Sequence, residues 1–427
     1  MSKRSITIWL VRDTCRVDDN PSLNLALETA GQSGTDCIAL ACLEPRRWEH
    51  HQFGLARTGC AWKCFRVNTL IRLRTELLKH GISLWIGAGE PSTLVGQIRE
   101  RFTISAIITD LPLATEEAVE NRRLQNLGVK VLTTQSDELF QAANINSALE
   151  QLPCSFTRFR KTIEKDESVV PAHPVKFSGL GSPVAQIWLD PPELYEARYF
   201  EKQCYEQPRW QQYLESGALS TYKKTRNALE GANMSSRLSA WLAHGCLSVR
   251  QVWHDTLEYE ESYGVNESTY WLRFELLWRE FFRWYSRLIG SILFTKTGKN
   301  GGYEVINSES VLFGNWCSGN TGVDIIDAAM RELRQTGWLS NRGRQLVASH
   351  LIYEYDLDWR LGAAWFESQL VDFDVASNWG NWAYIAGVGA DPRGGRIFNL
   401  ESQAERYDPK KTYRDRWLGP SPRIFEH

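Results

Sequence analysis

The chain has 427 residues, 43% hydrophobic and 23% charged, with a formal net charge of −2 at pH 7. This composition predicts an ordinary soluble globular protein of two or three domains, and it excludes nucleic-acid binding through overall basicity, so any such binding needs a local basic patch. No run of about 18 apolar residues occurs, so we expect no membrane span.

Residues 1–134 alternate short, β-branched apolar runs with amphipathic helical stretches. Strands buried on both faces and separated by helices predict an α/β domain with a doubly wound, Rossmann-like parallel sheet. No G-x-G-x-x-G follows a strand and no P-loop motif occurs, which argues against a simple dehydrogenase or ATPase. The expected strands are Ile6–Val11, Cys37–Leu43, Ser83–Ile86, Ala106–Thr109 and Val129–Thr133, and the expected helices include Ala61–His80 and Glu116–Leu127.

The alternating strand and helix pattern ends at residues 135–205, where prolines interrupt regular structure repeatedly. We interpret this stretch as a long inter-domain linker draped over the surface. Residues 206–427 then form a domain with a helical pattern that is rich in tryptophan and arginine. The whole chain holds 18 tryptophans against 3 methionines. Most of these should be packing, but the excess suggests stacking on a ring or electron transfer.

The first polar cluster of the helical domain is the segment Asn233–Ser239, which precedes an apolar stretch. Ser235 and Ser236 are placed as N-cap and first-turn residues of a helix. With Arg237 beside them, the helix N-terminus could hold a pyrophosphate. A plain capped helix explains the same pattern.

A second cluster combines Glu275, Trp278, Arg279 and Phe282, which recur on one helix face. A core face would carry aliphatic residues, so this face resembles a pocket wall. An indole stacks on a nucleic-acid base for about 1–3 kcal/mol, and a carboxylate can accept a hydrogen bond from a base edge.

The stretch from Gly337 to Asn399 holds the densest polar chemistry, and the rest of the chain is organised around it. Asn378 and Trp382 are four residues apart and share a helix face, which suits a large, flat cofactor with polar edges. Core tryptophans and ordinary caps or ion pairs remain the alternative. Its charged clusters contain Arg342, Arg344, Asp372 and Asp374. A basic group towards the end of the chain, which a solvated surface explains equally well, consists of Arg393, Arg396, Arg406, Lys410, Lys411, Arg414 and Arg416.

Metal and hydrolytic sites find no support in the sequence. The eight histidines show no ligand spacing, and HExxH, GxSxG and the kinase motifs are absent. The nine cysteines form no CxxC pair, and the N-terminus is too short for a secretory signal. Reduced thiols and a cytoplasmic location are therefore expected.

Taken together, these segments resemble the photolyase/cryptochrome flavoproteins, and among them the cryptochrome DASH group most closely. The resemblance runs essentially end to end and implies an α/β antenna domain, a linker and an all-α FAD-binding domain. Thr14 and Cys15 depart from the family's usual N-terminal motif. The matching segments are WLVRDTCRVDDNPSL, TRNALEGANMSSRLSAWLAHGCLS, FELLWREFFRW, SNRGRQ, DWRLGAAWFESQLVDFDVASNWGNWAYIAGVGADPRGGRIFNL and YDPKKTYRDRWL.

Site residues follow from the resemblance, position by position. It implies that Asn378 faces flavin N5 and that Trp382 and Trp359 transfer electrons to the flavin. The residues implied for the FAD phosphates are Tyr222, Ser235, Ser236, Arg237, Leu238 and Ser239; those for the rest of FAD are Arg279, Trp338, Asn341, Arg344, Asp372, Asp374 and Asn378; and those for a flipped-out pyrimidine dimer are Glu275, Trp278, Asn341, Gln345 and Tyr384.

The implied reaction is blue-light-driven repair of cyclobutane pyrimidine dimers. An electron passes from reduced FAD to the dimer, the ring splits and the electron returns, so the protein supplies orientation and electrostatics. The dimer must leave the base stack, which costs least in single-stranded or looped DNA, the substrate associated with the DASH group. We expect a monomer that needs no metal.

Three departures from the family pattern qualify this picture. The third position of its tryptophan chain falls at Ile306, so photoreduction either stops at Trp359 or uses a substitute such as Trp316 or Tyr303. The glutamate that grips a folate antenna in many members aligns near Pro112, which argues against methenyltetrahydrofolate. The region around Asn341 lacks the paired histidines of (6-4) photolyases.

The leading hypothesis is therefore a DASH-type dimer photolyase. The alternative is a blue-light photoreceptor with little or no repair, although the chain ends soon after Trp417 and carries Asn378 where plant-type receptors have an aspartate. A flavin oxidoreductase that does not use light is the third possibility, and it lacks a pyridine-nucleotide site.

Overall fold

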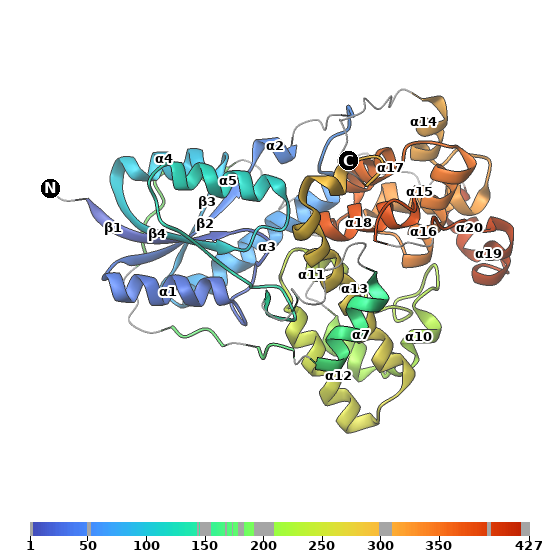
Figure 1. Cartoon of the computed structure of the whole chain (residues 1–427), viewed down its shortest axis with the longest axis horizontal. Coiled ribbons are helices and arrows are strands. Elements are labelled where there is room, and N and C mark those ends of the chain that lie inside the picture. Colours follow the sequence, from blue (N-terminus) through green and yellow to red (C-terminus); the bar gives the residue numbers. More distant parts are fainter. Residues whose placement is uncertain are drawn as a thin grey trace.

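The structure is a computed structural model of the whole chain. An α/β unit formed by the N-terminal part lies beside a larger helical unit (Figure 1). Both parts of the expected fold class are confirmed, while the boundaries at 134/135 and 205/206 stay predictions. The residues that the structure describes are 3–48, 53–142, 145, 155–166, 169–172, 174–177, 183–191, 209–298, 310–390 and 394–419.

The N-terminal unit is built on a five-stranded sheet in the order β3-β2-β1-β4-β5, in which every neighbouring pair is parallel. The order reverses between β1 and β4, which makes the sheet doubly wound. Its elements are β1 (Arg4–Val11), α1 (Pro21–Ser33), β2 (Asp36–Leu43), α2 (Pro45–Trp48), α3 (Cys60–Lys79), β3 (Ser83–Ala88), α4 (Pro91–Arg101), β4 (Phe102–Asp110), α5 (Thr115–Asn126) and β5 (Val131–Thr134).

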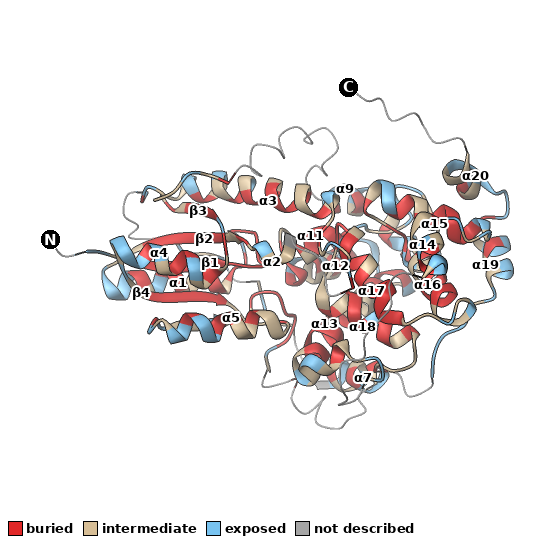
Figure 2. Cartoon of the chain, turned by 90° about the horizontal axis from the view of Figure 1, so that it is seen from above, coloured by how far each residue is buried: buried red, intermediate tan, exposed pale blue. Residues whose placement is uncertain are grey.

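Both faces of this sheet are covered, and the two-residue period of each strand divides its side chains between two cores. Trp9 and Val11 of β1 pack into one core, and Ile8 and Leu10 pack into the other. Strands β1, β2 and β3 accordingly stay buried along most of their length (Figure 2), whereas β5 at the edge is only partly buried. This double burial explains why the strands read as nearly continuous apolar runs in the sequence.

Local signals fix the helix that follows β1. The side chain of Asn20 accepts a hydrogen bond from the Leu23 amide, and Pro21 occupies the first helical turn, where a missing N–H costs nothing. Gly34 ends α1 in the left-handed conformation, with φ of 62°. The local sequence therefore specifies both ends of this helix.

The segment predicted as an irregular linker is partly regular. Residues Phe156–Asp166 form helix α7, which packs against α13 (Glu267–Ile289) of the helical unit. Residues 192–208 lie outside the described residues.

Two long helices of the helical unit, α13 and α12 (Val249–Tyr263), pack on each other. Gly362 is required where α17 meets α18, because a Cβ there would lie 2.1 Å from Cη2 of Trp382. None of the described helices is long and apolar enough to cross a membrane. The other helices are α9 (Trp210–Glu215), α10 (Tyr222–Thr225), α11 (Ser239–Ala243), α14 (Val311–Ser318), α15 (Asp324–Thr336), α16 (Asn341–Ser349), α17 (Trp359–Gln369), α18 (Val375–Ile385), α19 (Leu400–Tyr407) and α20 (Thr412–Leu418), with 3₁₀ turns at Ala218–Thr221 and Gly290–Phe294 and a π-helical turn at His350–Glu354.

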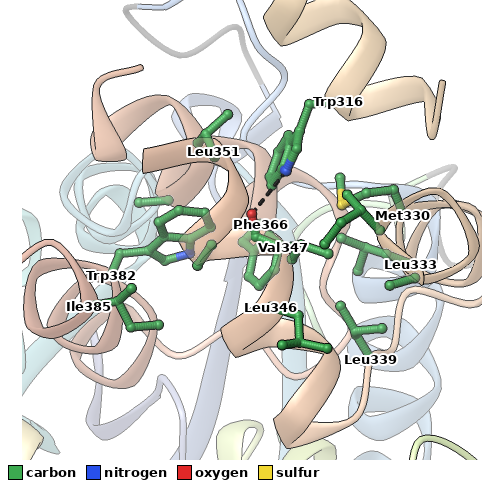
Figure 3. Packing of buried hydrophobic residues seen from close by; sticks show 14 of the residues in the cluster. Trp316, Met330, Leu333, Leu339, Leu346, Val347, Leu351, Phe366, Trp382 and Ile385 are labelled. Carbon is green, nitrogen blue, oxygen red and sulfur yellow. Dashed lines mark hydrogen bonds between the residues drawn. The ribbon is translucent and has the colours of Figure 1, made fainter. Parts of the chain in front are cut away.

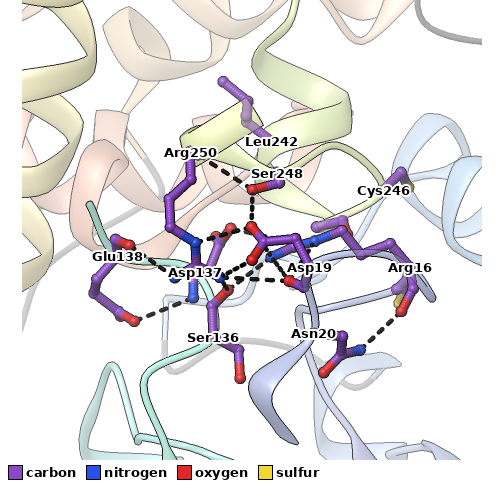
Figure 4. Close-up of polar contacts among 12 residues, drawn as sticks. Arg16, Asp19, Asn20, Ser136, Asp137, Glu138, Leu242, Cys246, Ser248 and Arg250 are labelled. Carbon is purple, nitrogen blue, oxygen red and sulfur yellow. Dashed lines mark hydrogen bonds and ion pairs between the residues drawn. The ribbon is translucent and has the colours of Figure 1, made fainter. Parts of the chain in front are cut away.

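A buried ionic cluster joins the two units (Figure 4). Arg250 of α12 is 1% exposed, and its Nε donates to Oδ2 of Asp19, 2.8 Å away in the α/β unit. The guanidinium groups of Arg16 and Arg250 both donate to the carbonyl oxygen of Ser136, at 2.7 and 3.0 Å. Three segments that are far apart in sequence therefore meet at one set of charges.

The segment after β5 carries a second ionic contact with the helical unit. Glu138 pairs with Arg287 at 2.5 Å and with Arg283 at 3.3 Å, both on α13. Burial alone would raise the pKa of Glu138, but the two guanidinium groups lower it to about 2. Arg283 also lies 3.3 Å from Asp374 at the start of α18, so this contact reaches the middle of the helical unit.

Replacing Glu138 with glutamine should lower the free energy of unfolding by about 3 kcal/mol at pH 7, because two buried arginines lose their partner. The folded-state pKa of about 2 lies below the ordinary 4.5. The stabilisation is therefore present above about pH 4.5 and is lost as the pH falls towards 2. Urea unfolding of both proteins at pH 7 and at pH 3 measures the effect.

The matched control for this prediction is Glu76→Gln, which removes an exposed ion pair with Lys79. It should change the unfolding free energy by less than about 0.5 kcal/mol at either pH. A Glu138→Gln variant as stable as this control would show that the buried contact does not hold the units together.

Candidate cofactor and substrate site

The helical unit contains a cavity of about 280 Å³ at the place where the sequence predicts the cofactor. Helices α13, α16, α17 and α18 and the loop before α11 form its walls. Most of the predicted site residues line it. They are Tyr222, Ser235, Ser236, Arg237, Leu238, Ser239, Glu275, Trp338, Asn341, Arg344, Gln345, Asp372, Asp374, Asn378 and Trp382.

One wall of the cavity is an arginine–aspartate pair. Arg344 donates through Nε to the Leu339 carbonyl oxygen at 2.8 Å and through Nη2 to Oδ2 of Asp372 at 2.7 Å. The other carboxylate oxygen of Asp372, Oδ1, is buried and has no hydrogen-bond partner within the described part of the chain. Asp372 lines the cavity, and a buried oxygen without a partner on this residue indicates a missing hydrogen-bond donor.

Helix α18 presents a second polar wall. Asp374 caps the helix by accepting from the Ser377 amide at 2.7 Å. One turn later, Asn378 donates through Nδ2 to the Ala363 carbonyl oxygen at 2.9 Å, which leaves its amide oxygen available to a ligand. The next turn places Trp382, 2% exposed, on the same face.

The loop from Ser235 to Leu238 lines the cavity, but the predicted helix start is wrong. Helix α11 begins at Ser239 with Leu238 at the N-cap position, so neither Ser235 nor Ser236 caps it. The local cause is Arg237, whose φ of 49° breaks the helical geometry. Its guanidinium lies 4.2 Å from the centre of the Trp338 ring, a cation–π contact that fixes the loop against the cavity wall.

Glu275 lies at the other end of the cavity, where Arg226 pairs with its Oε1 at 2.6 Å. Burial raises the pKa of Glu275, although Arg226 counteracts it. The sequence prediction missed Arg226 as a site residue. The signal that could have identified it is the cluster of basic residues at 223–226, one helical segment before the predicted phosphate loop.

Two further predicted residues stand beside the cavity rather than in its wall. Trp278 and Tyr384 meet edge to face, with ring centres 5.5 Å apart. Tyr384 adjoins Ile385, which lines the cavity, and Trp278 lies one turn after Glu275. The two rings therefore flank the cavity next to the carboxylate.

Arg279 is misplaced by the sequence prediction. It was expected to line the cofactor, but its guanidinium pairs with Asp137 and donates to the carbonyl oxygens of Asp137 at 3.0 Å and Leu242 at 3.4 Å. The partner lies 142 residues away, so the helix pattern could not reveal it. Arg279 instead belongs to the ionic contacts between the two units.

The predicted electron-transfer residues make different aromatic contacts. Trp382 lies edge to face with Phe366 at 5.1 Å and with Trp316 at 6.1 Å (Figure 3). Trp359 lies edge to face with Trp379 at 5.9 Å. Trp316 is thus in contact with Trp382. Ile306 and Tyr303 lie outside the described residues.

A larger cavity, of about 430 Å³, lies between the carboxyl edge of the sheet and the helical unit. Asp13 after β1 and Leu113 after β4 reach it from the sheet, at the reversal of strand order where doubly wound folds bind ligands. Trp379 and Asp374 reach it from α18, and Asp374 also lines the first cavity. Pro112, by contrast, accepts a hydrogen bond from Arg287 through its carbonyl oxygen at 3.0 Å.

The smaller cavity fits the FAD expected from the sequence. Its polar groups are two acceptors, an unpaired carboxylate oxygen on Asp372 and an amide oxygen on Asn378, together with hydroxyl groups on the serine loop that can donate. A flavin needs acceptors for ring and ribose donors, and a pyrophosphate needs N–H and O–H donors. Within the described residues, no group of three or more His, Cys, Asp or Glu side chains could hold a metal ion.

Comparisons with known proteins identify the family of this chain. Residues 271–423 match the family model of the FAD binding domain of DNA photolyase, and residues 6–176 match that of DNA photolyase. A cryptochrome DASH from Idiomarina loihiensis is 38% identical, over 98% of this chain and 94% of that protein.

Similar solved structures belong to the same family. The cryptochrome of Synechocystis sp. PCC6803 superposes with a TM-score of 0.87 at 36% identity, over 98% of this chain and 89% of that one. The photolyase of Sulfolobus tokodaii, solved with two FAD molecules, has a TM-score of 0.76 at 26% identity, over 97% and 90% of the two chains. This chain therefore belongs to the photolyase/cryptochrome family of flavoproteins, in which its relatives include the DASH cryptochromes.

Proposed function

We propose that the protein is a blue-light-driven, FAD-dependent photolyase that repairs cyclobutane pyrimidine dimers in single-stranded or looped DNA. The observation that carries the proposal is the position of Glu275, which lines the cofactor cavity and lies one turn from the aromatic pair Trp278 and Tyr384. The two adjacent bases of a pyrimidine dimer can be bound there, next to the cofactor, by two aromatic rings and a carboxylate. Family membership supports the same assignment.

Within this proposal, bound FAD supplies light absorption and the electron that opens the dimer ring. Asp372 accepts hydrogen bonds from the cofactor through its unpaired Oδ1, and Arg344 holds the carboxylate in place. Asn378 offers its amide oxygen to an N–H group of the flavin ring, since its amide nitrogen already donates to the Ala363 carbonyl oxygen. These residues orient the ring and take no part in bond breaking.

The dimer-binding side works by stacking and hydrogen bonding. Trp278 and Tyr384 are inclined at 70°, so they can support two bases that are not coplanar. Glu275, with its raised pKa and its Arg226 partner, can accept from a base N–H as a carboxylate. Arg226 also brings positive charge to this end of the cavity, and so does Arg396, whose guanidinium lies 4.6 Å from the Tyr384 ring centre. These side chains supply the local positive charge that a protein of net charge −2 needs in order to bind DNA.

Single-stranded DNA is the proposed substrate because a dimer in a duplex must first be unstacked, at a cost of a few kcal/mol. We also propose that the protein acts as a cytoplasmic monomer. Free thiols in the described segments support a reducing compartment; they are Cys15, Cys37, Cys42, Cys60, Cys246 and Cys317. Gel filtration and cell fractionation test these two points. We propose no folate contact at Pro112, since its ring has no carboxylate to offer.

The direct test is illumination of the reduced protein with oligonucleotides that carry one cyclobutane dimer. Restored thymines, scored by chromatography, should appear under blue light and not in the dark, and faster with single-stranded than with double-stranded DNA. A flavin-loaded protein that restores no bases would favour the alternative of a blue-light photoreceptor. A folded protein that binds no flavin would contradict the proposal altogether.

Trp278→Ala should weaken binding of a dimer-containing oligonucleotide roughly tenfold to a hundredfold, because it removes one stacking contact. Flavin content should not change, since Trp278 stands outside the cavity wall. Filter binding in the dark and absorbance of the released flavin measure the two quantities. Trp253→Ala is the matched control, since Trp253 is also half-buried but lies on α12; equal affinity of the two variants would remove Trp278 from the site.

Trp382→Phe should slow photoreduction of oxidised flavin by external thiol, because the ring that lines the cavity no longer donates readily. Trp316→Phe and Trp359→Phe then test which of the two residues passes an electron to Trp382; Trp316 is in contact with it. The variant with the slower rate identifies the second donor. Trp9→Phe, in the core of the α/β unit, is the control. An unchanged rate in Trp382→Phe would mean that electrons enter elsewhere.

A further inference from the structure

The ring that stacks most closely on Trp278 comes from the connecting segment, not from the helical unit. Phe156, the first residue of α7, lies parallel to the indole, with ring centres 3.7 Å apart and planes inclined at 13°. Phe156 is 6% exposed, whereas Trp278 is half-buried. Phe156 therefore covers one face of the indole and leaves part of the ring accessible.

Other rings meet Trp278 at larger distances or steeper angles. Phe281 and Tyr384 approach it edge to face, at 5.9 and 5.5 Å, and Phe282 is tilted by 30° at 5.5 Å. Edge contacts restrict where the indole lies, but a parallel ring in direct contact also restricts how its plane is turned. Phe156 is the contact that sets this plane.

Helix α7 does not depend on Phe156 alone for its place on α13. Arg160 and Glu164 both bond to the Tyr270 hydroxyl, at 2.7 Å each. Phe159, fully buried, packs on Phe281 with ring centres 5.4 Å apart. A change at Phe156 should therefore leave the helix docked, so its effect on Trp278 can be measured.

We propose that Phe156 is a positioning residue for the lesion site: it holds the Trp278 indole in the plane on which a damaged base stacks. This inference rests on the proposed function, because it takes Trp278 as the lesion contact. An indole held on one face by Phe156 offers the other side for stacking without first losing rotational freedom, and that preorganisation favours binding. Residues of the inter-domain segment thereby take part in substrate recognition.

The first experiment measures the indole itself and needs no substrate. Brief hydroxyl-radical exposure, followed by mass spectrometry of the peptide that contains Trp278, reports how well its ring is covered. In Phe156→Ala, oxidation of Trp278 should rise several-fold over the wild-type protein. In Phe159→Ala, the matched control on the same helix, and in Phe156→Tyr, which keeps the ring, it should stay near the wild-type value. Unchanged oxidation in Phe156→Ala overturns the proposal.

The second experiment measures lesion binding in the dark, with a single-stranded oligonucleotide carrying one thymine dimer and the same strand without it. Phe156→Ala should lose about three- to tenfold in affinity for the damaged strand only, with flavin content unchanged, and Phe156→Tyr should restore it. Equal losses in Phe156→Ala and Phe159→Ala would show a general loosening of α7 and overturn the proposal. If Trp278→Ala binds the lesion normally, the proposed function fails at this residue, while the oxidation result still decides whether Phe156 holds the indole.

Discussion

The buried charges between the two units are the constraint on which the rest of the structure depends. A charged group that leaves water must find a partner of opposite sign and a full set of hydrogen bonds, or it costs several kcal/mol. Asp19 meets this demand through Arg250, and Glu138 through Arg283 and Arg287. Arg283 also pairs with Asp374, so the linked ion pairs between the two units extend to the N-cap residue of α18. The position of the cofactor wall is therefore tied to the docking of the α/β unit.

Helix α18 is the partition that this arrangement holds in place. Its helical period turns Asn378 and Trp382 towards the smaller cavity and Trp379 towards the larger one, and Asp374 at its start reaches both. Two ligands bound in these cavities would be separated by a single helix. Trp379 donates to Glu367 at 3.1 Å, and Glu367 pairs with Arg57 of the α/β unit at 2.9 Å. The larger cavity thus forms only when both units are docked, whereas the walls of the smaller one come from the helical unit.

The sequence was a good guide wherever a residue's role depends on its own element. The strands were predicted because both faces of the sheet are buried, and α18 because Asn378 and Trp382 recur at helical spacing. The sequence was a poor guide where a residue distant in the chain decides what a side chain contacts. The Arg279 guanidinium could have turned to the cofactor, but Asp137 from the linker takes it. The prolines of that linker concealed the helix that places Phe156 on Trp278. The positive φ of Arg237, which delays the start of α11, has no signature in residue type, since glycine or asparagine is the usual sign of that conformation.

Part of the surplus of tryptophan also has a physical explanation in the acceptors of the indole N–H groups. A buried indole usually finds such an acceptor. Among the described residues, at least seven tryptophans donate to a carbonyl or carboxylate oxygen, for example Trp85 to Val184, Trp284 to Glu280 and Trp316 to Val347. Most of these indoles also join segments that are distant in sequence, whereas Trp284 bonds within its own helix. Trp338 and Trp382 differ because they line the cavity, and Trp278 because it stands half-buried beside it. Composition alone could not separate the two groups, since the distinction lies in what each ring faces.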